Sequence, residues 1–297
     1  MPENGVVQIS HEEILTYDEI TRISRCMTGL GIRKIKLTGG EPLIRKNCAT
    51  LVRMLKELPG IEKVTLTTNG VLLEEQIADL AEAGLDDINI SLDTLNAAEF
   101  AKVTRRESLD RVLYGIQAAL QYPQIGLKIN CVPVVEEQEN LVSIARLAKQ
   151  YPIHVRFIEM MPIGYGKDFQ FWGESEICEI LEKAYGRMTP IKERYGNGPC
   201  HYYKIEEFQG KIGFISAMTH KFCDQCNRVR MTAEGFLKAC LQYQTGTDLK
   251  KLMRSGCTAD ELTEAIQKVI WEKPVSHHFT SEEIETDECK LMSQIGG

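Results

Sequence analysis

Three cysteines near residue 230 have the spacing and the neighbours of a metal site. Cys223, Cys226 and Cys240 form a C-x2-C-x13-C pattern, and Asn227-Arg228-Val229-Arg230 follows the second cysteine directly. Two thiolates from one short turn and a third from a returning segment can hold one metal centre. This stretch therefore predicts a metal site with cationic side chains beside it.

The identity of the metal depends on the fourth ligand. His220 lies three residues before Cys223 and could complete a structural Cys3His zinc site. The alternative is an iron-sulfur cluster held by three thiolates, in which the remaining iron is open to a further ligand. Arg228 and Arg230 favour the cluster, because two fork-shaped cations beside an open iron suit an anionic, phosphorylated substrate. Spacing alone leaves both alternatives open.

The composition excludes several classes of protein. The 297 residues are 43% hydrophobic, which is enough for one large domain or a domain with an appendage. A net charge of -7 argues against a nucleic-acid or membrane-surface protein, so any phosphate site must be local. No apolar run is long enough to span a bilayer, and the first residues lack the features of a signal peptide. We expect a cytoplasmic protein, with no nucleic-acid and no membrane partner, whose cysteines are thiols and metal ligands rather than disulfides.

Alternating strands and helices must position these residues. Five short apolar, β-branched runs predict strands over 35–37, 64–66, 88–90, 127–132 and 155–158. Apolar residues at helical spacing predict helices over 51–58, 77–84 and 112–120. Such alternation predicts βαβ units with right-handed crossovers and a parallel sheet.

Polar, small or charged residues follow each predicted strand. They are Thr38 to Pro42, Thr67 to Gly70, Ser91 to Asp93, Lys128 with Asn130, and Arg156 with Glu159, Met160 and Met161. Because the carboxyl ends of the strands in such barrels meet on one face, we expect these residues to line one site. Gly39 and Gly40 would let a ligand approach the backbone, and Lys36 and Lys128 could supply charges for phosphate.

A second region follows Pro162, where the alternation ends. Residues 202–205 and 211–215 predict an antiparallel pair that leads into the cysteine site, and 249–253 and 262–270 predict helices. We therefore expect residues 1–162 to form a partial (β/α) barrel core and residues 163–297 to form a C-terminal region that carries the metal.

Several segments together resemble the GTP 3',8-cyclase (MoaA) family of radical S-adenosylmethionine (SAM) enzymes, which acts in molybdenum cofactor (molybdopterin) biosynthesis. They are Leu37 to Pro42, Thr67 to Gly70, Ser91 to Asp93, Arg156 to Glu159, Cys223 to Leu241, and Gly296-Gly297. The resemblance covers essentially the whole chain, and the cysteine block and the double glycine are its most specific parts. It implies an incomplete (β/α)6 TIM-like radical SAM barrel, with the first strand missing, and a C-terminal Fe-S-binding region.

The resemblance also implies ligands for individual residues. S-adenosyl-L-methionine would be bound by Gly40, Ser91 and Met161. GTP would be bound by Lys36, Thr67, Lys128, Arg228, Val229 and Arg230. An auxiliary [4Fe-4S] cluster, with its open iron at the purine, would be held by Cys223, Cys226 and Cys240. No side chain is expected to act as a catalytic acid or base, because the cofactors carry the chemistry.

The implied reaction converts GTP to 3',8-cyclo-7,8-dihydroguanosine 5'-triphosphate. A deoxyadenosyl radical takes the 3' hydrogen of the ribose, and the sugar radical then attacks carbon 8 of guanine. The resemblance further implies that cyclic pyranopterin monophosphate synthase is the next enzyme in the pathway, and that Gly296 and Gly297 enter the active site. The oligomeric state stays open, with a homodimer as one expectation.

One motif of the family has no counterpart in this sequence. The family holds its SAM-binding [4Fe-4S] cluster with a C-x3-C-x2-C motif, and none of the ten cysteines here has that spacing. Met1-Pro2-Glu3 resembles the residues that follow the third cysteine of the motif. We therefore expect a truncated chain that does not cleave SAM as written and regains that cluster only with the missing segment. The alternative is a non-catalytic GTP-binding or zinc-stabilised relative.

Overall fold

The computed structural model describes residues 9–135, 137–163, 166, 172–193, 195–196, 198–279, 287–288, 290 and 292–295. The predicted roles of Gly296 and Gly297 therefore fall outside the described residues, as does the Met1-Pro2-Glu3 segment.

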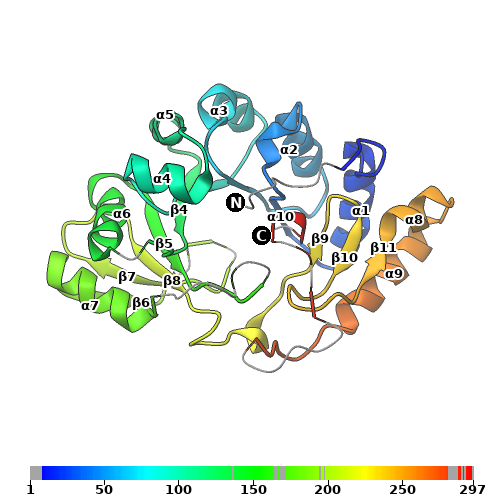
Figure 1. Ribbon diagram of the computed structural model, residues 1–297. Coiled ribbons are helices and arrows are strands. Elements are labelled where there is room, and N and C mark those ends of the chain that lie inside the picture. The colour runs from blue at the N-terminus through cyan, green and yellow to red at the C-terminus, as the bar shows by residue number, and fades with distance from the viewer. Residues whose placement is uncertain are drawn as a thin grey trace.

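An eight-stranded sheet curves around one half of the molecule (Figure 1). Its first five strands run parallel in chain order: β1 (Lys34–Leu37), β2 (Lys63–Thr68), β3 (Asp87–Ser91), β4 (Gly126–Cys131) and β5 (His154–Ile158). The sheet continues with β8 (Ile212–Ile215), parallel to β5, and then with the antiparallel β7 (His201–Ile205) and β6 (Met188–Ile191). The five predicted strands and the predicted antiparallel pair are confirmed.

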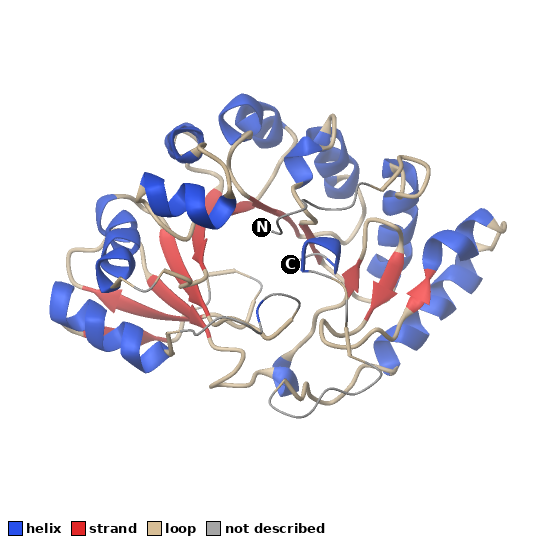
Figure 2. Ribbon diagram, in the orientation of Figure 1, coloured by secondary structure: helices blue, strands red, loops and turns tan. Residues whose placement is uncertain are grey.

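Helices cover the outer face of this sheet (Figure 2). They are the 3-10 helix η1 (Pro42–Ile44) and the α-helices α2 (Cys48–Lys56), α3 (Leu73–Glu82), α4 (Ala97–Thr104), α5 (Leu109–Ala119), α6 (Gln138–Gln150) and α7 (Glu174–Tyr185). The main core lies between the helices and the sheet and contains Leu55, Leu80 and Ile88, which are fully buried. This arrangement confirms an incomplete TIM-like barrel.

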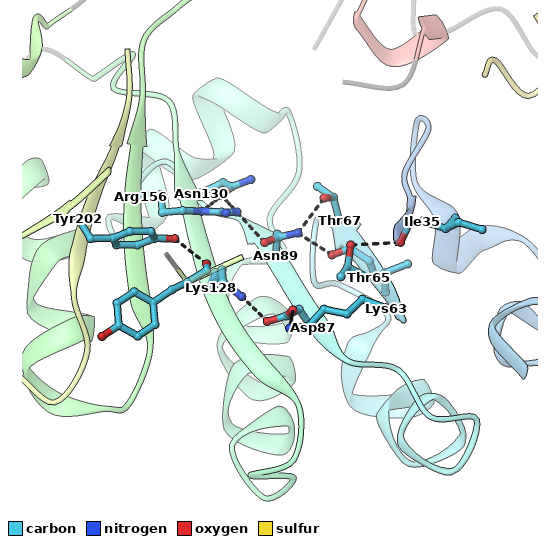
Figure 3. Close-up of polar contacts among 12 residues, drawn as sticks. Ile35, Lys63, Thr65, Thr67, Asp87, Asn89, Lys128, Asn130, Arg156 and Tyr202 are labelled. Atoms are coloured by element: carbon cyan, nitrogen blue, oxygen red, sulfur yellow. Dashed lines mark hydrogen bonds and ion pairs between the residues drawn. The ribbon is translucent and has the colours of Figure 1, made fainter. Parts of the chain in front are cut away.

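The two faces of the barrel sheet differ in polarity. Successive side chains of a strand point to opposite faces. In β3, Ile88 and Ile90 belong to the core under the helices, whereas Asp87 and Asn89 join polar contacts on the inner face (Figure 3). The inner face is therefore free to bind polar ligands while the outer face holds the fold together.

The C-terminal region forms a second sheet. It consists of β9 (Arg230–Met231), β10 (Phe236–Lys238) and β11 (Thr247–Asp248), and the 3-10 helix η3 (Cys223–Gln225) precedes it. Three helices, α1 (Tyr17–Gly29), α8 (Leu249–Arg254) and α9 (Ala259–Trp271), complete its core, which includes Ile23, Leu237 and Ile266. The helices predicted over 249–253 and 262–270 are confirmed. The division at residue 162 stays a prediction: strands β6 to β8 extend the barrel sheet, and α1 packs with the C-terminal region.

The end of the described chain returns to the inner side of the barrel sheet (Figure 1). There the short helix α10 (Met292–Ile295), which the sequence did not predict, places Ile295 against Ile163 and Leu241 in a small apolar cluster. Met161 packs against the same cluster. The cluster thus joins the loop after β5, the segment after Cys240 and the C-terminal helix. Among the described residues, no helix has both the length and the apolar character needed to cross a membrane.

Candidate functional site

A row of polar side chains crosses the inner face of the barrel sheet (Figure 3). Arg156 donates from Nη2 to Asn89 Oδ1 at 2.6 Å and from Nε to Asn130 Oδ1 at 2.9 Å. Asn89 Nδ2 in turn donates to Leu66 O at 3.1 Å and to Thr67 Oγ1 at 3.2 Å. The guanidinium of Arg156 is buried, and both of these acceptors are neutral amides. These contacts hold the cation in place without neutralising it.

A second polar layer precedes the first along the strands. Lys128 Nζ pairs with Asp87 Oδ1, and Lys63 Nζ lies 3.6 Å from Asp87 Oδ2. Burial lowers the pKa of Lys128 and outweighs the opposing effect of Asp87. A Cβ atom at position 126 would overlap with Asp87 Oδ1, so Gly126 leaves room for the carboxylate. Lys128, which we predicted to bind GTP, is thus already engaged in an ion pair.

Cations from both regions converge on Lys36. Burial, followed by the charges of Arg156, Arg228, Arg230 and Lys128, lowers the pKa of Lys36 to about 8. Lys36 lies on β1, at the end of the strand order, and the residue keeps some solvent-exposed surface, so its burial is incomplete. The charges of three other predicted GTP residues, Lys128, Arg228 and Arg230, therefore act on Lys36. Like charges at such a site repel one another and favour a bound polyanion.

Both arginines of the Arg-x-Arg segment act electrostatically on Lys36 of the barrel. Burial and the nearby Arg228 lower the pKa of Arg230 to about 10, against the opposing effect of Cys226 and Cys240. The guanidinium of Arg228 lies 5.0 Å from the ring centroid of Phe222. Between the arginines, Val229 packs on the C-terminal core. An apolar residue thus anchors the segment that carries the two cations.

The three candidate metal ligands come from two segments. Cys223 and Cys226 lie at the ends of one 3-10 turn, Cys240 follows β10, and all three are partly buried free thiols. Cys226 and Cys240 both act to raise the pKa of Arg230. Cys240 and Cys223 both act to raise the pKa of the Tyr243 phenol. Within the part of the chain that the structure describes, no three His, Cys, Asp or Glu side chains form a metal-ligand group. The three thiols therefore lie near the same residues, but they are not close enough together to bind one metal in this arrangement.

Cys226 has the surroundings of a metal-binding thiol. Burial opposes its ionisation, but a backbone hydrogen bond from Arg228 and the charges of Arg228 and Lys273 together lower the pKa of the thiol. The thiolate is the form that binds metal. In its chemistry, though not in the present spacing of the thiols, the donor set of three free cysteines with cations beside them therefore fits an iron-sulfur cluster.

His220, the alternative zinc ligand, makes its contacts elsewhere. Its Nδ1 atom lies 3.5 Å from Glu174 Oε2 and 3.2 Å from Thr219 Oγ1. Glu174, at the start of α7, also forms hydrogen bonds with His201 and Ser216. This position favours the three-thiolate cluster over a Cys3His zinc site.

The predicted SAM-binding residues lie at the carboxyl ends of alternate strands. Gly40 follows β1, Ser91 ends β3 with an exposed side chain, and Met161 follows β5. Gly39 has a φ of 135°, a conformation that favours glycine, and a Cβ added there would meet no atom within 4 Å. The backbone at Gly39 and Gly40 is therefore open to a ligand.

Two glutamates that the sequence placed at this rim, without an individual role, fix loops there. Glu41 Oε2 accepts the backbone N–H of Asn69 at 2.6 Å and so joins the loop after β1 to the end of β2. Glu159 Oε2 accepts the backbone N–H groups of Met218 and Thr219 at 2.7 and 3.0 Å. Glu159 thereby joins the end of β5 to the segment that leads into the cysteines.

Sequence reasoning also missed Asp87 and Asn89. Their signal was present, because Asp87, Asn89 and Ser91 occupy alternate positions of a strand whose other residues are isoleucines. A parallel strand is usually apolar on both faces, so the alternation of polar residues with isoleucines indicates that one face of this strand is polar.

Comparison with known proteins covers both regions. Residues 5–152 match the Radical SAM superfamily, and residues 153–279 match the family described as Molybdenum Cofactor Synthesis C. The GTP 3',8-cyclase of Clostridium perfringens (strain 13 / Type A) is 44% identical over 291 residues, which are 97% of this chain and 89% of that protein. The GTP 3',8-cyclase of Syntrophomonas wolfei is 40% identical over 304 residues, covering 100% of this chain and 92% of that protein.

A solved structure shares the fold. The crystal structure of Streptococcus suis SuiB bound to S-adenosylmethionine aligns with a TM-score of 0.61, covering 86% of this chain and 61% of that chain. The sequence identity is 14%, so this likeness shows the fold alone. The radical SAM type of barrel itself is shown by the family match over residues 5–152.

Proposed function

Because this chain belongs to the family of GTP 3',8-cyclases, we propose that it converts GTP to 3',8-cyclo-7,8-dihydroguanosine 5'-triphosphate in molybdenum cofactor biosynthesis. The observation that carries the proposal is the group of cations around Lys36, which come from the barrel and from the C-terminal region. They gather in a chain whose net charge is -7, so the positive field is local. A nucleoside triphosphate is a ligand of the matching charge.

The triphosphate would bind chiefly to Lys36, Arg228 and Arg230. A bound polyanion relieves the repulsion among these cations and raises the pKa of Lys36 from its value of about 8. Arg156 and Lys128 would contribute to the field from their fixed positions on β5 and β4. Thr67 would offer its hydroxyl, and Val229 would hold the arginines in position. The free energy of binding therefore depends on both regions.

Cys223, Cys226 and Cys240 would hold the auxiliary [4Fe-4S] cluster. Three thiolates leave one iron open, and this iron, when bound, supplies a site for the purine. Arg228 follows Cys226 by two residues, so the segment that binds the metal also delivers a cation to the nucleotide. This shared segment would fix the base relative to the triphosphate.

Gly40, Ser91 and Met161 would bind SAM at the rim of the barrel. SAM supplies the deoxyadenosyl radical when a second [4Fe-4S] cluster reduces it, and the residues of this chain orient the reactants and exclude water. That cluster needs a C-x3-C-x2-C segment, a spacing that none of the ten cysteines has. We propose that the 297 residues alone bind GTP without cleaving SAM, and that cyclic pyranopterin monophosphate synthase consumes the cyclised product.

The missing spacing favours one alternative, a GTP-binding relative without radical chemistry. The two functions predict different products once a C-x3-C-x2-C segment is supplied at the amino terminus. The cyclase would then form 5'-deoxyadenosine and the cyclised nucleotide, whereas the non-catalytic relative would form neither.

The proposal is tested first by binding. Anaerobically reconstituted chain should take up about four irons at the cysteine site and bind GTP in a calorimetric titration. Arg230→Ala should weaken GTP binding by about 1.5 to 3 kcal/mol, as expected for a lost charge-assisted contact. Arg111→Ala is the matched control, because Arg111 pairs with Glu75 and is half exposed. Stoichiometric zinc without iron uptake, or equal GTP affinity in both variants, would contradict the proposal.

A further inference from the structure

Lys273 lies between the two segments that carry the candidate cysteine ligands. Its Nζ atom donates to Arg228 O at 2.7 Å and to Ala239 O at 2.5 Å. Arg228 follows Cys226 by two residues, and Ala239 immediately precedes Cys240. One ammonium group thus joins the backbone of both segments.

The backbone of Lys273 is itself fixed. Its N–H donates to Ile270 O at 3.3 Å, at the end of α9. α9 is anchored in the C-terminal core by Ile266 and Val269, which are buried. Pro274 follows and restricts the backbone of the residue before it. The lysine therefore extends from a rigid support to the metal segments.

The charge of Lys273 acts on the same site. Its ammonium group is held by the carbonyls of Arg228, two residues after Cys226, and of Ala239, directly before Cys240. A cluster with thiolate ligands takes its reduction potential from net charge and hydrogen bonds around it. A fixed ammonium nearby stabilises the more negative, reduced state. Lys273 thus has both a geometric and an electrostatic connection to the cysteines.

We propose that Lys273 is a positioning residue for the auxiliary cluster: it ties the segments of Cys226 and Cys240 to each other, and it raises the reduction potential of that cluster. This inference rests on the proposed function, because it assumes iron at the cysteine site. Partners of this kind, outside the ligands themselves, typically change metal affinity or activity when they are removed.

The test compares three variants of the reconstituted chain. Lys273→Met keeps the length of the side chain but removes the donors and the charge, whereas Lys273→Arg keeps both. Lys268→Met is the matched control, because Lys268 lies on α9, five residues before Lys273 and 3.9 Å from Glu272, with a side chain that is 72% exposed. The measurements are iron and sulfide per chain, the rate of iron loss to a chelator, and the midpoint potential followed by electron paramagnetic resonance.

Lys273→Met should lose iron about 10- to 100-fold faster than wild type. Its cluster should also have a more negative midpoint potential. Lys273→Arg should restore the potential in large part, and Lys268→Met should match wild type. If Lys273 had only a structural role, its substitution would change iron retention but would leave the midpoint potential of the cluster unchanged.

Unchanged iron loss and potential in Lys273→Met, with an intact cluster in wild type, would overturn the inference. If Lys273→Met does not fold, Lys273→Gln keeps a donor for the carbonyls and removes the charge, and an unchanged potential in that variant would be equally decisive. Failure of the wild-type chain to take up iron would instead overturn the proposed function.

Discussion

The barrel and the C-terminal region hold their site residues by different means. In the barrel, strand register pairs Asn130 with Arg156, the Arg156 side chain reaches Asn89 on the strand beyond, and main-chain hydrogen bonds between strands fix the row. Near the cysteines the regular structure is short, with strands of two or three residues, and side chains such as Lys273 join the segments instead. Substitutions in the barrel should therefore change charge or stability without changing the cysteine site, whereas substitutions near the cysteines should change the geometry of that site.

A buried ion pair shows the same dependence on side chains in the C-terminal region. Lys238, at the end of β10, pairs with Glu288, and their side chains are 2% and 5% exposed. The pair joins the strand before Cys240 to the segment that leads toward α10. Breaking it would disturb the cysteine segment and the C-terminal helix together.

The largest contrast is expected from removal of a ligand. Cys240→Ala should abolish the iron-sulfur absorption of the reconstituted chain, because two thiolates do not complete the site. Cys257→Ala should keep it, since Cys257 is a partly buried free thiol of the C-terminal core. Iron content and absorption spectra measure the outcome. A normal cluster in Cys240→Ala would remove Cys240 from the site.

A substitution in the barrel should affect stability more than iron content. Lys128→Met leaves Asp87 buried without its close partner, and breaking such a pair costs about 3 to 5 kcal/mol. Lys63→Met removes the more distant and more exposed partner of Asp87, which should cost at most about 1 kcal/mol. Chemical denaturation of the two variants measures the difference. Equal losses would mean that Asp87 does not depend on Lys128.

The pH dependence of GTP binding should report on Lys36. In the free protein its pKa is about 8, and the triphosphate raises it, so binding takes up a proton above this pH. Affinity should therefore be constant below pH 8 and fall by up to about tenfold per pH unit above it, until the pKa of the complex is reached. Calorimetric titrations from pH 7 to about 9.5 measure the profile. Lys36→Met should bind more weakly with a flatter profile, and an unchanged slope would assign the proton to another group.

The sequence predicted regular, repeated structure better than irregular contacts. The five parallel strands were readable because each is a β-branched run bounded by helices, and the polar segments after them marked the rim of the barrel. Strands β9 and β11 have two residues each, too few to show a period. α10 has four residues and likewise gave no signal.

The parts of the candidate site that are close together in the sequence could be predicted, whereas contacts between distant residues could not. The cysteines and the Arg-x-Arg segment stand together in the sequence, so their chemistry was visible locally. Lys273 is 45 residues from Arg228, and no local pattern indicates that the two meet. The ion pair of Lys128 with Asp87 was equally hidden, because register across neighbouring strands decides which inner-face residues touch.

The central claim is that one nucleotide site is shared by both regions, and the titration of Lys36 tests it most directly without any ligand. Lysine side chains can be labelled and followed by nuclear magnetic resonance, with Lys36→Met identifying the signal. Removing a cation of the C-terminal region, in Arg230→Met, should raise the pKa of Lys36 from about 8 toward its ordinary value, while Arg254→Met should leave it unchanged. An unaltered pKa of Lys36 in both Arg228→Met and Arg230→Met would show that the two regions do not share a site.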